Sequence, residues 1–227
     1  MLRAALVGLT LVSLTACTAS GPRTPYGRFM EARANPGKVV ATELAFARAA
    51  QENGQWTAFA EYAADDAILF SASGFTPARE WLSKQRDPES AVTWTPHEVL
   101  SSCDGSLAIT RGAFAYPAGQ SGTYITVWER QRDGDYKWIA DGAYAGQEAP
   151  GDASSVKART ADCDSMPTLV AMPTTTERRG GKSADGTLTW SASHTQGTGT
   201  SFVSRILEEG ESVLAIDAMQ QAGASSE

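Results

Sequence analysis

Residues 122–141, GTYITVWERQRDGDYKWIAD, decide the fold class. Tyr124 and Trp128 share one face of an extended strand, whereas Ile125 and Val127 lie on the other. Asp133-Gly134, between the two apolar runs, is typical of a tight turn joining antiparallel strands. The stretch therefore predicts a β-hairpin with apolar groups on both faces, and its sheet must be covered on both sides or curl around something.

The same alternation extends toward the N-terminus. Two further runs, 92–101 and 107–115, flank an Asp104-Gly105 turn. Together with the runs 122–131 and 136–143 they predict a four-stranded antiparallel meander.

Helices are predicted before the meander. Asn35 can cap a helix whose first residue is Pro36, and Gly54 is suited to its C-terminal end. Within this helix, Val40, Leu44 and Ala47 form the expected apolar stripe, and Glu43 lies off it. Spacing predicts a second helix over 55–64, a strand over 67–71 and a third helix over 77–85, with Asp65-Asp66 at the helix-to-strand corner.

The order of these elements resembles the nuclear transport factor 2-like superfamily, and the residues are similar to its SnoaL-like branch. The stretches that carry the resemblance are 43–46 (ELAF), 59–69 (FAEYAADDAIL), 122–132 and 134–141. The resemblance implies an α+β domain over 35–146, in which N-terminal helices pack on a curved antiparallel sheet. In that cone-shaped architecture the sheet wraps an apolar pocket suited to small molecules.

Beyond the domain, residues 147–184 read as a linker, 185–219 as a three-stranded C-terminal β-meander, and 220–227 as a tail. Three strands are marginal alone, so they should dock on the main domain or on a second chain. Asp104-Gly105-Ser106-Leu107 recurs as Asp185-Gly186-Thr187-Leu188, which we interpret as chance similarity between two meanders.

The N-terminus carries a targeting signal. Arg3 precedes the apolar stretch 4–14, which has the length of a signal-peptide core. Leu14-Thr15-Ala16-Cys17 resembles the lipobox of bacterial lipoproteins, which implies cleavage of 1–16 and acylation of Cys17, including palmitate-type chains. The protein would then be anchored in the cell envelope, in the outer membrane facing the periplasm if the cell is Gram-negative. An ordinary secretory signal is the alternative. Residues 17–34 read as a flexible tether.

In an oxidising compartment, the two remaining cysteines favour a disulfide between Cys103 and Cys163, with two buried reduced thiols as the alternative. The chain has 19 basic and 26 acidic residues, a net charge of −7, and no basic block, which argues against nucleic acid as a partner. The sequence has two histidines and neither a CxxC nor an HExxH motif, so it predicts no metal site. It also lacks a phosphate-binding glycine loop, so it predicts no cofactor.

Catalytic candidates are few. Resemblance to ketosteroid isomerase members would require a tyrosine on the first helix and an acid on the first strand, but Phe46 and the carboxylate-free stretch 68–73 occupy these positions. Asp141, His97 and Tyr62 remain. We expect Asp141 to be a strand-end residue that faces water or caps a turn, although a carboxylate in an aromatic pocket could act as a general base.

The sequence therefore predicts an envelope lipoprotein whose domain binds a small apolar ligand or a protein partner without catalysis. The alternative is a SnoaL-like isomerase, dehydratase or cyclase using a pocket aspartate or histidine as its base. Since members of the superfamily dimerise through the sheet face, a homodimer is one partner that the resemblance implies.

Overall fold

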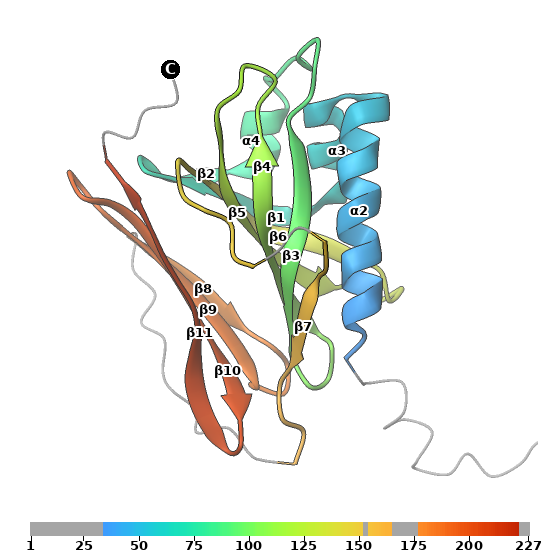
Figure 1. Cartoon of the computed structure of the whole chain (residues 1–227), viewed down its shortest axis with the longest axis vertical. Helices are drawn as coiled ribbons and strands as arrows, with labels where there is room; N and C mark the ends of the chain where they lie inside the picture. The colour runs from blue at the N-terminus through green and yellow to red at the C-terminus, as the bar shows by residue number, and fades with distance from the viewer. Residues whose placement is uncertain (1–33, 152–153, 165–176, 223–227) are drawn as a thin grey trace, which may run out of the picture. The chain divides into compact units, whose positions relative to one another are not determined.

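The computed structural model describes residues 34–151, 154–164 and 177–222. They form an α+β fold with two sheets (Figure 1). Sheet A has the strand order β2-β1-β6-β5-β4-β3-β7, and sheet B has the order β11-β10-β9-β8. The predicted signal peptide 1–16, Cys17 and nearly all of the predicted tether lie outside the described residues. Among the described residues, no helix is long and apolar enough to cross a membrane.

The described helices are α2 (Pro36–Asn53), α3 (Gln55–Tyr62) and α4 (Ala78–Leu82). The strands of sheet A are β1 (Ala63–Ser71), β2 (Gly74–Pro77), β3 (Thr93–Ser101), β4 (Leu107–Ala115), β5 (Ser121–Arg130), β6 (Tyr136–Ala145) and β7 (Lys157–Thr160). Those of sheet B are β8 (Arg178–Lys182), β9 (Leu188–Thr195), β10 (Gly199–Glu208) and β11 (Glu211–Gln221).

Helix α2 begins as predicted, because the Asn35 side chain accepts a hydrogen bond from the backbone N–H of Lys38. Its buried face differs from the prediction by one position. The buried residues are Val39, Glu43, Phe46 and Ala50, whereas Leu44 is 46% exposed. The predicted polar position of Glu43 was therefore wrong, because hydrogen-bond donors on the sheet stabilise its carboxyl group inside the domain.

The segment after α2 also departs from the prediction. Helix α3 ends at Tyr62, and β1 follows at once, so Asp65-Asp66 lies exposed on a strand instead of at a corner. Strand β2 was not predicted. It forms an antiparallel hairpin with β1. Gly74 opens this strand with φ +112°, a conformation that favours glycine.

The central meander confirms the prediction. Strands β3, β4, β5 and β6 pair antiparallel in sequence, and the bounds of β4 match those predicted. Strand β1 adds to β6 in parallel. Strand β7, inside the predicted linker, adds to β3 in parallel. In the β5–β6 register, Thr126 lies opposite Asp141, which places both side chains on the helix-facing side of sheet A.

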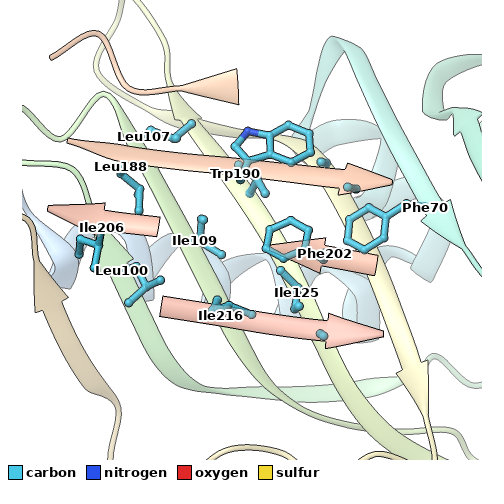
Figure 2. Packing of buried hydrophobic residues seen from close by; sticks show 14 of the residues in the cluster. Phe70, Leu100, Leu107, Ile109, Ile125, Leu188, Trp190, Phe202, Ile206 and Ile216 are labelled. Atoms are coloured by element: carbon cyan, nitrogen blue, oxygen red, sulfur yellow. The ribbon is translucent and has the colours of Figure 1, made fainter. Parts of the chain in front are cut away.

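Sheet B contains four strands instead of the predicted three, because β8 pairs with β9. The helices cover one side of sheet A and sheet B covers the other (Figure 1). Figure 2 shows Trp190, Phe202 and Ile216 of sheet B against Ile109 and Ile125 of sheet A, in one buried cluster. The face that we expected a homodimer partner to cover is thus packed within the same chain.

The repeated tetrapeptide joins the two sheets. The turns 102–107 (SCDGSL) and 183–188 (SADGTL) have the same internal pattern: the aspartate Oδ1 accepts from the hydroxyl of the first serine and from the backbone N–H of the fifth residue. The turns also bond each other reciprocally. The backbone N–H of Asp104 donates to Asp185 Oδ2 (2.8 Å), and that of Asp185 donates to Asp104 Oδ2 (3.1 Å). The resemblance between the two stretches therefore has a structural counterpart.

A disulfide joins Cys103 and Cys163, as predicted. It ties the start of the first of these turns to the segment that follows β7. The two cysteines are 60 residues apart in sequence, and on the chain-entropy model a loop of that size stabilises the fold by about 4 kcal/mol.

Candidate ligand-binding pocket

A partly open cavity of about 240 Å³ lies between the three helices and the helix-facing side of sheet A. This volume lies below the roughly 300–1,000 Å³ of pockets for drug-sized ligands, so it suits a smaller organic molecule. Nine of its 19 lining residues are aromatic: Phe46, Trp56, Phe59, Phe70, Trp81, Trp94, Phe114, Tyr116 and Tyr124. Four of these aromatic residues come from the helices. The alternation along β5 and β6 directs Tyr124, Thr126 and Asp141 toward the helices.

We call the nine aromatic side chains of the lining the aromatic wall, and most of them pack ring against ring. The Phe46 ring lies 4.8 Å from the rings of both Phe59 and Trp94, measured between centroids. The rings of Trp56 and Trp81 meet edge to face at 4.9 Å. Such ring contacts stabilise the fold by more than the burial of apolar area alone, and they restrict the movement of the rings. The wall is therefore largely preformed.

Asp141 supplies the single carboxyl group of the pocket lining. It lies in the middle of β6, so the expectation of a strand-end residue was wrong. Its Oδ2 accepts a hydrogen bond from Thr126 Oγ1 at 2.6 Å, and no basic side chain in the described part of the chain pairs with it. Burial raises the pKa of Asp141 to about 7, against the lowering effect of the Thr126 bond; Glu43 adds a smaller upward effect.

Gly142, the residue after Asp141, lets β6 pass close to Phe70, which lines the cavity. A Cβ atom at Gly142 would lie 2.2 Å from the ring of Phe70. Glycine is thus required where the strand passes this ring.

Glu43 is a fully buried carboxyl group, located in α2 behind the aromatic wall. Trp94 Nε1 donates to its Oε1 (2.7 Å), while Thr110 Oγ1 (2.5 Å) and Trp128 Nε1 (3.1 Å) donate to its Oε2. Burial raises the pKa of Glu43, and these three bonds offset part of the rise. Sequence reasoning missed this residue. The signal was present, because Val39, Phe46 and Ala50 bracket it at helical spacing.

Two tyrosines add phenol hydroxyl groups to the polar lining of the pocket. The hydroxyl of Tyr124 is buried and has no hydrogen-bond partner within the described residues. Burial, with smaller contributions from Glu43 and Asp141, holds its pKa well above the usual value. Burial and Asp141 also raise the pKa of Tyr116. Both tyrosines therefore stay neutral and act as hydrogen-bond donors or acceptors.

The other predicted candidates lie outside the pocket lining. Tyr62 stacks on Phe46 at 5.0 Å, and the Lys137 ammonium lies 5.9 Å from its ring centre. His97 is buried on β3, where its Nδ1 donates to the backbone carbonyl of Pro150 at 2.9 Å. The structure thus does not bring Asp141, His97 and Tyr62 together. Across the described ranges, no group of three or more His, Cys, Asp or Glu side chains could hold a metal ion.

Comparison with solved structures finds a protein of Parabacteroides distasonis that is provisionally assigned as a ketosteroid isomerase. The match has a TM-score of 0.38 and 17% identity, and it covers 50% of this chain and 94% of that one. No protein-family model and no curated protein matches the chain. The residues of the pocket are therefore the basis for assigning a function.

Proposed function

We propose that the domain binds a small, largely apolar molecule that carries one polar group. The observation that supports this proposal is the single carboxyl group of Asp141 in a cavity whose other lining is half aromatic. With a pKa of about 7, this carboxyl group is present in both protonation states near neutral pH. It can therefore donate a hydrogen bond to a ligand or accept one from it.

Filling the cavity should abolish binding. Ala143 lines the pocket, so Ala143→Phe places a ring where the ligand would lie. With 2-phenylethanol as the probe, we expect isothermal titration calorimetry to show a loss of affinity of at least about tenfold. Ala115→Phe is the matched control, because Ala115 is exposed on β4 and does not line the pocket. Equal binding by both variants and the unmodified protein would refute the pocket assignment.

A second candidate function is proton transfer by a SnoaL-like isomerase, dehydratase or cyclase. A carboxyl group with a pKa of about 7 in an apolar cavity favours it, since such a group can serve as a general base at neutral pH. The accompanying hydrogen-bond donor would be Tyr124 rather than His97 or Tyr62. Turnover of a bound ligand by the unmodified protein, but not by Asp141→Asn, would make catalysis the function.

We also propose that the protein is a nuclear transport factor 2-like lipoprotein anchored in the cell envelope through Cys17. The support is the lipobox-like sequence Leu14-Thr15-Ala16-Cys17 after an apolar stretch. Cys17→Ser should prevent acylation, because serine has no thiol to form the thioether. We expect radiolabelled palmitate to be incorporated into the unmodified protein only, and the variant to be lost from washed membranes. A labelled, membrane-bound Cys17→Ser protein would contradict the proposal.

A further inference from the structure

The charges around the cavity have one sign. Asp141 is the single carboxylic acid among the lining residues, and none of them is Lys, Arg or His. The next charge that acts on Asp141 is Glu43, also an acid. The polar remainder of the lining consists of hydroxyl and amide groups: Gln55, Ser71, Tyr116, Tyr124, Thr126 and Gln220. An ionised Asp141 thus has hydrogen-bond support but no countercharge.

We infer that the ligand of this pocket is an organic cation, an amine or quaternary ammonium compound with an apolar body. The inference rests on the proposed function and specifies its ligand class. A positive head group would supply the countercharge that Asp141 lacks, and the lining contains Trp56, Trp81 and Trp94, whose π systems attract cations. The apolar body would occupy the rest of the aromatic lining.

The same electrostatics argue against an anionic ligand and predict a different pH dependence for a neutral one. An anionic ligand, such as a fatty acid, would bring a further negative charge toward Asp141 and Glu43 in a poorly hydrated site. A neutral ligand with a hydrogen-bond acceptor could bind only to the protonated form of Asp141. It would therefore show the opposite pH dependence to a cation.

The pH dependence follows from the groups that face Asp141. These are Thr126 and Tyr124 from β5, Tyr116 from the β4–β5 connection and Glu43 from α2. Tyr144, on the same strand as Asp141, packs on the other side of sheet A and interacts with it only electrostatically. The tyrosines have raised pKa values and stay neutral. A cation binds the ionised form of Asp141, so its affinity should increase with pH as this carboxyl group loses its proton.

The test compares benzyltrimethylammonium with its uncharged isostere, neopentylbenzene, by isothermal titration calorimetry on the purified protein. Between about pH 5 and about pH 9, we expect cation affinity to increase by about ten- to a hundredfold, whereas isostere affinity stays constant. At the upper pH the cation should bind at least about tenfold more tightly than the isostere.

Asp141→Asn keeps an acceptor for the Thr126 hydroxyl and removes the charge. It should abolish the advantage of the cation and its pH dependence without changing isostere binding, which also shows that the pocket is intact. Asp66→Asn, at an exposed aspartate of β1, should leave both affinities unchanged. If the isostere binds as tightly as the cation at every pH, the cation inference is overturned and the pocket proposal stands. If neither probe binds, both are overturned.

Discussion

Glu43→Ala should lower the free energy of unfolding by about 3–5 kcal/mol. Three donors converge on the Glu43 carboxyl group: the indole N–H groups of Trp94 and Trp128, and the hydroxyl of Thr110. Alanine would leave an empty space and deprive these three donors of their shared acceptor, although Trp128 also donates to Thr110 Oγ1. Urea denaturation followed by tryptophan fluorescence measures the loss.

Glu43→Gln is the matched control. Glutamine has nearly the same shape and keeps one acceptor oxygen, so the loss should be clearly smaller, about 1–3 kcal/mol. Leu44→Ala removes an exposed side chain from the neighbouring position of α2 and should change stability little. An alanine variant at position 43 that unfolds at the same urea concentration as the unmodified protein would contradict the buried-acceptor role.

Asp141→Asn should stabilise the protein increasingly as pH rises. Burial raises the pKa of Asp141 to about 7 in the folded state, whereas an aspartate in the unfolded chain has its ordinary pKa of about 3.9. Between these values the folded state keeps a proton that the unfolded state has released, so the stability of the unmodified protein falls as pH rises through this window. Asparagine cannot lose that proton. The stability difference should therefore grow by up to about 4 kcal/mol between pH 4 and pH 8.

Denaturation curves at several pH values test this expectation. Asp66→Asn, at the exposed aspartate on β1, should show a constant difference from the unmodified protein. The decisive quantity is the slope against pH, because any fixed cost of the amide at position 141 shifts all values equally. A difference between Asp141→Asn and the unmodified protein that does not vary with pH would show that this carboxyl group is not desolvated.

The meander was predictable because its signals are local. Apolar alternation and the Asp-Gly turns define β4, β5 and β6 within a few residues of the chain. Strands β7 (KART) and β8 (RRGGK) carry no such alternation. They are strands because β3 and β9, brought from elsewhere in the chain, supply their hydrogen-bond partners. A pattern within one segment cannot contain that information.

The candidate site was predictable only in outline. Asp141 was identified as a candidate, but its burial depends on Thr126 from the adjacent strand and on aromatic residues from the helices. Glu43 was placed on the wrong face, because a carboxylate in a helix normally faces water unless distant donors meet it. Those donors lie 51 to 85 residues away in the sequence.

The reciprocal turns at Asp104 and Asp185 have a consequence for self-association. In a dimer, an apolar sheet face is covered only above a threshold protein concentration. Here the second sheet belongs to the same polypeptide, so the effective concentration of one face for the other is fixed by the chain. Dilution therefore cannot uncover the Ile109 and Ile125 face, because its cover is part of the same chain.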